Sequence, residues 1–169
     1  MATIHVDEIK ALARRAHGDP QLRERLFADI HGDNRSDAVH AAWTLTHLPN
    51  IDNIHIATHR EELVQMAITT TDTSLRRLSL ALLERLDWNI NGDPSEYYMQ
   101  LLDFCLTHMM LPDEPYGVRA LCMKLSYQLS IPYPELLGEL RQSLLLLEPS
   151  ELGAGVRHTR NKLLKLLTP

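Results

Sequence analysis

The sequence predicts an all-α fold, and three observations support this prediction. Apolar residues recur at helical spacing along most of the 169 residues, whereas strict alternation of apolar and polar residues is hard to find. Only 7 glycines and 5% aromatic residues are present, which disfavours an all-β sandwich or barrel. The prolines fall between the apolar segments rather than inside them, where a proline would break a helix.

Three helices are expected in the first third of the chain. Gly18 ends the first helix, and Pro20 begins the second, because proline is well tolerated in a first helical turn. Pro49 ends the third helix. Segment 51–56 alternates in part, and we interpret it as a connection into the next helix rather than a strand. The expected helices cover about 6–17, 20–32 and 36–48.

Six further helices are expected in the rest of the chain. The clearest follows Asp72-Thr73-Ser74, a run of residues that cap helix N-termini, and it has a leucine-rich face. Pro94 and Pro134 lie at helix starts, and Pro112 and Pro132 follow helix ends. The expected ranges are 60–70, 75–86, 93–110, 116–130, 134–148 and 155–167.

Four of these helices contain the same local pattern near their starts, an apolar residue followed by a basic or imidazole side chain. The pairs are separated by 36, 43 and 38 residues, and one other amphipathic helix lies in each interval. An internal period of this length is typical of stacked helix pairs. The four pairs are Val39-His40, Leu75-Arg76, Val118-Arg119 and Val156-Arg157.

With Asp37 before Val39 and Asp72 before Leu75, this pattern resembles the HEAT-like helical repeat class. The first copy has His40 where the family usually has arginine, and the last copy lacks an aspartate shortly before Val156. The resemblance implies one right-handed α-α superhelix over residues 1–169, with the first helix as a cap. Its four repeats are expected at about 20–48, 58–87, 94–130 and 134–167.

The resemblance also gives two interpretations of the recurring basic residues. In the family, the arginine usually bridges to acidic groups and carbonyls between repeats, and Asp72, Asp113 or Glu114 could be its partners here. Alternatively, second helices line the concave face, where a basic ladder would suit an acidic peptide or a phosphorylated partner. The candidate binding residues are His40, Arg76, Arg77, Arg119, Arg157, His158 and Arg160.

One histidine pair is a weak candidate for a metal site. His55 and His59 are four residues apart, a spacing that places two imidazoles on one face of a helix. A solvated or capping role is the alternative, because the zinc-protease motif is not met. The sequence contains no Gly-rich phosphate loop, nucleophile elbow or CxxC motif, so we expect no cofactor and no enzymatic activity.

Two further features concern the helices at 93–110 and 116–130. Cys105 and Cys122 are equidistant from the turn between them, so in an antiparallel hairpin the two thiols could be neighbours. They would be either inert core residues or a redox-sensitive pair. Tyr97 and Tyr98 point about 100° apart, so part of this aromatic and methionine-rich surface is expected outside the core. Trp43 is expected to be a packing residue.

The composition and charge of the chain disfavour two classes of function. A formal net charge of −5 disfavours a general binder of phosphate backbones. No apolar run approaches the roughly 18–20 residues of a membrane span, and no secretory signal is recognised, so we expect a cytoplasmic protein.

The leading hypothesis is a non-catalytic protein-interaction or scaffold module that binds a protein or peptide on its concave surface. The alternative is a DNA-binding HEAT-like protein related to alkylpurine DNA glycosylases, although lysine is scarce outside Lys162 and Lys165. A homodimer through the C-terminal helix is a third hypothesis. It rests on the leucines of that helix, which are Leu163, Leu164, Leu166 and Leu167.

Overall fold

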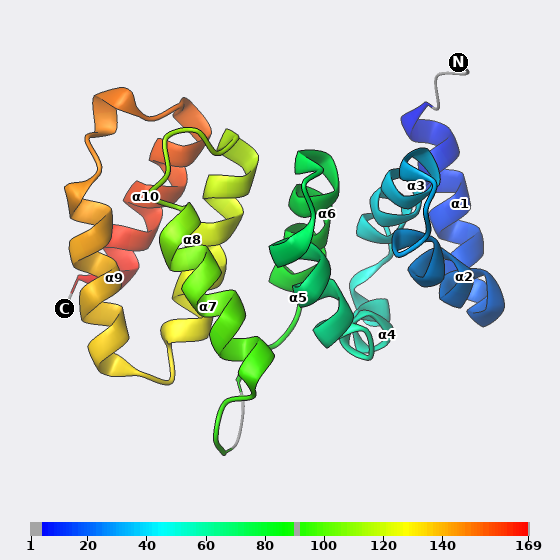
Figure 1. The fold of residues 1–169 in the computed structure, drawn as a ribbon, viewed down its shortest axis with the longest axis horizontal. Coiled ribbons are helices and arrows are strands. Elements are labelled where there is room, and N and C mark those ends of the chain that lie inside the picture. The colour runs from blue at the N-terminus through cyan, green and yellow to red at the C-terminus, as the bar shows by residue number, and fades with distance from the viewer. Residues whose placement is uncertain (1–4, 90–91, 169) are drawn as a thin grey trace. The chain divides into compact units, whose positions relative to one another are not determined.

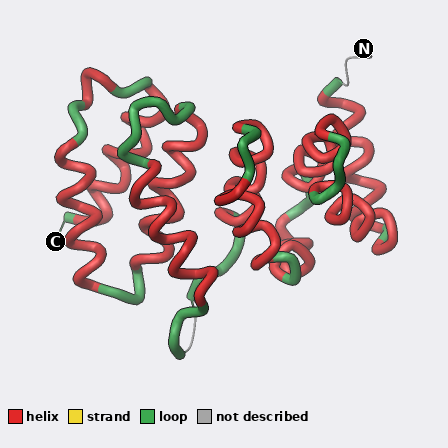
Figure 2. The backbone as a smooth tube through the Cα atoms, in the orientation of Figure 1, coloured by secondary structure: helices red, strands yellow, loops and turns green. Residues whose placement is uncertain are grey.

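The computed structural model describes residues 5–89 and 92–168, and every regular element in these two ranges is helical (Figures 1 and 2). The prediction of an all-α fold is therefore confirmed. The chain forms two compact units, with the boundary between Leu86 and Asp87. None of the described helices is long and apolar enough to span a membrane.

The first unit contains six α-helices and one short 3₁₀ helix. α2 and α3 form one pair, α5 and α6 form the next, and the second helices of these pairs, α3 and α6, pack on each other. α1 packs on both α2 and α3, as expected for a capping helix. The elements are α1 (Val6–Gly18), α2 (Pro20–Ile30), α3 (Arg35–Thr46), η1 (Asn50–Asp52), α4 (Asn53–Ala57), α5 (Arg60–Thr69) and α6 (Thr73–Glu84).

The second unit repeats this arrangement. α7 pairs with α8 and α9 with α10, and the second helices α8 and α10 pack on each other. Figure 1 shows α9 in orange beside α10 in red. The elements are α7 (Glu96–His108), α8 (Tyr116–Ser130), α9 (Pro134–Leu146), η2 (Pro149–Glu151) and α10 (Ala154–Leu167).

Side-chain caps fix the starts of four of the described α-helices. In each case an oxygen of the N-cap side chain accepts a hydrogen bond from a backbone N–H in the first turn, which would otherwise lack an intrahelical partner. Asp72 caps α6 in this way through the Leu75 N–H at 2.9 Å, so the helix begins at Thr73 rather than at Leu75. The other three caps are Asp19 for α2, Asn34 for α3 and Ser95 for α7.

The connection expected at 51–56 contains η1 and the short helix α4. Ile56 is fully buried, whereas Ile51 and Ile54 are exposed. Only one isoleucine of this segment therefore contributes to the core, which explains why its sequence shows no clear helical periodicity.

The core of the second unit contains both cysteines and an aromatic pair. Cys105 and Cys122 are fully buried free thiols joined by a side-chain hydrogen bond, so the predicted proximity is confirmed. The Tyr98 hydroxyl donates to the Leu129 carbonyl at 2.6 Å, and Trp88 packs edge-on against the Tyr98 ring at 5.8 Å. Burial raises the pKa of Tyr98 to about 12.

The neighbouring residues on α7 and directly after it divide between core and surface. Phe104 and Met109 are buried, Tyr97 and Met110 are half-buried, and Met99 is exposed. With Tyr98, half of the predicted aromatic and methionine-rich surface is core, and the rest reaches solvent at least in part.

Candidate functional site

The recurring arginine of α6 binds the end of the helix that precedes it. Arg76 Nε–H donates to the Ala67 carbonyl at 2.9 Å, and Nη2–H donates to the carbonyls of Ile68 and Thr70. The last carbonyls of a helix lack intrahelical partners and lie at the negative end of the helix dipole. A guanidinium group supplies both hydrogen-bond donors for these carbonyls and a positive charge beside the dipole. Arg76 thus joins α6 to the C-terminus of α5.

The second unit contains two arginines with the same role. Arg119 on α8 donates from Nε to the Met109 carbonyl at 3.0 Å, at the end of α7. Arg160 on α10 donates from Nε to the Leu144 carbonyl at 2.8 Å, near the end of α9. The exposed fractions of Arg119 and Arg160 are only 4% and 8%, so backbone oxygens compensate for the burial of both guanidinium groups.

Sequence reasoning missed two further arginines of this kind. Arg23 on α2 is buried and donates to the carbonyls of Ala16 and His17 at the end of α1. Arg85, directly after α6, donates to four carbonyls at the end of α3 and beyond it, and to the side-chain oxygen of Asn53. Burial lowers the pKa of Arg85, and the negative charges of Asp52 and Glu84 oppose this shift. Arg85 follows Glu84 rather than an apolar residue, and the pair Leu22-Arg23 lies outside the repeat spacing, so the repeat pattern marks neither arginine.

Two of the acidic residues expected near the repeat arginines, Asp72 and Glu114, contact other side chains in the structure. Asp72 pairs with Arg35, which lies at the start of α3. The Glu114 carboxylate lies 3.0 Å from Nδ1 of His108. The first of these contacts joins the N-terminal ends of α3 and α6, the two second helices of the first unit.

The remaining predicted binding residues face outward. Arg77 on α6 and Arg157 and His158 on α10 are exposed, and His40 on α3 is half-buried. Arg157 occupies the same register in α10 as Arg119 in α8, the fourth helical residue. Arg160, one turn later, provides the contact to the helix end instead, and so Arg157 reaches solvent.

A groove of about 410 Å³ lies beside His40, between α1 and α3. Its wall is mostly aliphatic and also contains one carboxylate and one guanidinium group. The lining residues are Glu8, Ile9, Ala11, Leu12, Arg15 and His40. A shallow apolar groove with a few charged groups is suited to the side chains of a peptide.

Two half-buried rings follow His40, one on α3 and one directly after it. Trp43 and His47 are one turn apart, with ring centroids 6.5 Å from each other. Burial, together with the positive charge of Lys10, lowers the pKa of His47 and so favours the neutral ring. Trp43 is thus accessible in part, although the sequence predicted only a packing role. Tryptophan is enriched among the residues that contribute most to contacts between proteins.

The proposed metal pair His55 and His59 does not lie on one continuous helix, because α4 ends at Ala57 and α5 begins at Arg60. His59 stacks on Phe27 at 3.9 Å, and its two ring nitrogens lie 2.9 Å from Glu24 and 3.2 Å from Glu62. In residues 5–89 and 92–168 no group of three or more side chains could hold a metal ion. His59 therefore connects α2 to the start of α5.

A polar hollow of about 550 Å³ lies beside this histidine contact. His31, after α2, approaches Glu62 to 3.6 Å. The hollow is lined by His31, Thr58, Glu61, Glu62, Gln65, Met66 and Thr69.

The C-terminal helix has a distinctive charge. α10 carries five basic or imidazole side chains and no carboxylate, in a chain whose formal net charge is −5. Of these five, only Arg160 is buried. The five residues are Arg157, His158, Arg160, Lys162 and Lys165.

Comparison with family models finds one that covers almost the whole chain. A model described as a HEAT repeat domain matches residues 1–167. No curated protein and no solved structure matches the chain. The resemblance inferred from the four repeated residue pairs is thereby confirmed.

Proposed function

The chain belongs to the HEAT repeat family, and from this membership we propose that it is a non-catalytic module that binds an acidic segment of a partner protein through its second helices. Stacked helix pairs present extended surfaces that suit protein binding. The observation that carries this proposal is the division of the basic residues. Arg76, Arg119 and Arg160 bind helix ends, whereas Arg77, Arg157 and His158 are exposed on second helices.

The acidic character of the partner follows from the free side chains. Exposed guanidinium groups bind carboxylates and phosphates with two parallel hydrogen bonds, and so an acidic or phosphorylated segment is the chemical match. In the first unit, Trp43 and the groove beside His40 offer apolar contacts on and beside α3, and α3 packs on α6, the second helix that carries the exposed Arg77. Tryptophan and arginine contribute much of the binding energy in many protein interfaces.

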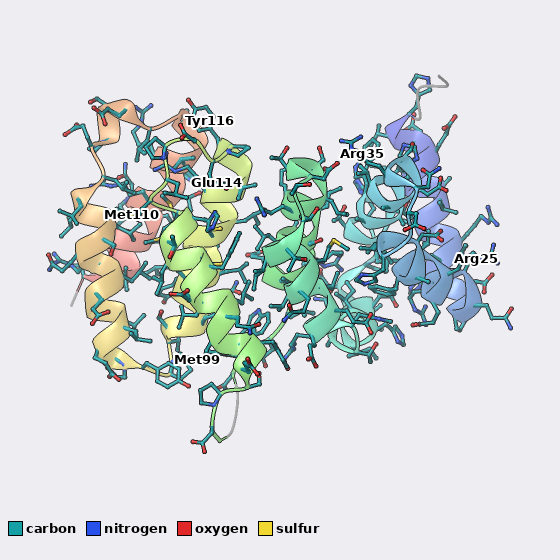
Figure 3. The ribbon with its side chains drawn as sticks, in the orientation of Figure 1. Arg25, Arg35, Met99, Met110, Glu114 and Tyr116 are labelled. Carbon is teal, nitrogen blue, oxygen red and sulfur yellow. The ribbon has the colours of Figure 1, made fainter. Side chains whose placement is uncertain are left out.

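The proposal is tested by capture of partners from the native host. The full chain and its variants Arg77→Glu and Arg157→Glu are used as baits, and bound proteins are quantified by mass spectrometry. The matched control is Arg25→Glu on α2, an exposed arginine of a first helix that points away from the helices of its unit (Figure 3). We expect the same partner with the native chain and the control, and less of it with at least one of the other variants.

Two results would contradict this function. Equal recovery with all baits would place the binding surface elsewhere. A gel shift with duplex DNA at low salt that Arg77→Glu or Arg157→Glu abolishes would favour the DNA-binding alternative, because contacts to phosphates depend strongly on salt and on positive charge.

A further inference from the structure

The last helix pair has one acidic and one basic outer face. On α9, Glu135 and Glu139 are exposed and one helical turn apart, so their carboxylates lie on the same face. On α10, Lys162 and Lys165 are exposed and three residues apart, which also places them on one face. The two helices of this pair therefore have opposite charge.

These charges do not neutralise each other within the described part of the chain. No ion pair joins the glutamates of α9 to the lysines of α10 there. All four side chains are exposed, and so all four are accessible to another molecule.

Exposed leucines accompany the charges. Leu146 on α9 is 80% exposed and Leu166 on α10 is 55% exposed, although both occur in helices whose other sides are packed. Leu166 follows directly on Lys165 and lies one turn from Lys162, so apolar and basic groups share this face.

We propose that this face binds a second copy of the chain, with α9 of each copy against α10 of the other. A two-fold axis then brings Glu135 and Glu139 opposite Lys162 and Lys165 twice, and it covers Leu146 and Leu166 in both copies. Such an isologous contact closes at two subunits. Charge complementarity of this kind fixes the register and the choice of partner in protein interfaces.

This dimer does not depend on the proposed function. The proposed contact does not include Arg157, which points about 140° from Lys162 and about 80° from Lys165 on an ideal helix. In the first unit, His40 and Arg77 are on other helices.

Analytical ultracentrifugation of the full chain tests the proposal by charge exchange. We expect the native chain to sediment as a dimer at about 100 µM, a concentration well above the dissociation constants typical of specific protein complexes. The variant Lys162→Glu with Lys165→Glu should be monomeric, and so should Glu135→Lys with Glu139→Lys. Combining all four substitutions should restore the dimer, because it exchanges the charges and keeps their complementarity.

The matched control is Lys124→Glu with Arg25→Glu, two exposed basic residues on α8 and α2, and it should remain dimeric. Circular dichroism establishes that every variant is folded. A monomeric native chain, open-ended association, or a folded fourfold variant that stays monomeric would each overturn the proposal. Loss of the dimer in the control would also overturn it, since net charge rather than this face would then be responsible.

Discussion

At the scale of single residues, arginine joins the helices of this protein. Arg23, Arg76, Arg85, Arg119 and Arg160 each donate to backbone carbonyls at or near a helix end. The guanidinium group is suited to this task because it is planar, permanently charged and rich in donors. A basic side chain in the repeat pattern therefore has a structural role when it reaches the carbonyls of a helix end, and only the exposed ones are available for the proposed binding.

The first prediction concerns Arg119. Substitution Arg119→Met keeps the aliphatic volume but removes the hydrogen bond to the Met109 carbonyl, so the free energy of unfolding should fall by about 1.5–3 kcal/mol. Denaturation of the full chain by urea measures this loss. The control Arg157→Met removes an exposed side chain and should change the stability by less than about 0.5 kcal/mol. Equal effects of both substitutions would contradict the structural role of Arg119.

The second prediction concerns the two thiols. Burial, and the hydrogen bond with Cys122, raise the pKa of Cys105, and only the thiolate is an effective nucleophile. Both cysteines should therefore react very slowly with a disulfide reagent in the native protein and rapidly after unfolding. The number of thiols titrated with Ellman's reagent, with and without denaturant, measures the difference. Rapid reaction of two thiols in the folded protein would instead favour a redox-sensitive pair.

At the scale of helices, the sequence predicts most starts and ends, because caps and prolines act locally. α8 lies at 116–130 as predicted, between Pro115 and Pro132. α4 was missed because only Ile56 of its segment is buried. The sequence also did not predict which of Arg157 and Arg160 binds the end of α9. The two residues are one helical turn apart, and this difference in position decides which guanidinium reaches the Leu144 carbonyl.

The third prediction concerns the start of α6. The hydrogen bond from the Leu75 N–H is the largest of the effects that lower the pKa of Asp72 below its ordinary value of 3.8, and Arg35 also contributes. A lowered pKa in the folded state means that the ionised carboxylate stabilises the fold above the unfolded value. This stabilisation is lost as the pH falls through the folded value.

The variant Asp72→Asn tests this effect, because asparagine retains a capping oxygen but does not titrate. We expect the native protein to be more stable than the variant at neutral pH. The difference between them should decrease below about pH 4 and vanish in stronger acid, where Asp72 is protonated in both states. Urea denaturation from pH 7 to pH 2 measures the difference. A difference that is independent of pH would contradict the assigned role of the charge.

At the scale of the whole molecule, the repeat period predicted four helix pairs and a capping helix, and the structure contains all of them. The period did not predict the boundary at Leu86 and Asp87, because it describes each pair and not how strongly successive pairs pack. One continuous superhelix over residues 1–169 stays a prediction. The basic face of α10 could have been found in the sequence, since this helix lacks any carboxylate.

The division into two units leads to the last prediction. Leu63 in α5 and Leu125 in α8 are fully buried, one in each unit, and substitution of such a leucine by alanine costs about 2–5 kcal/mol. Each helix pair contacts mainly its neighbours in a repeat array, and so such a loss should remain largely within one unit. Hydrogen exchange of the full chain should therefore accelerate mostly in residues 5–86 for Leu63→Ala and mostly in residues 92–168 for Leu125→Ala. If either substitution accelerated exchange equally throughout, the two units would unfold as one cooperative structure, and the boundary would have no energetic meaning.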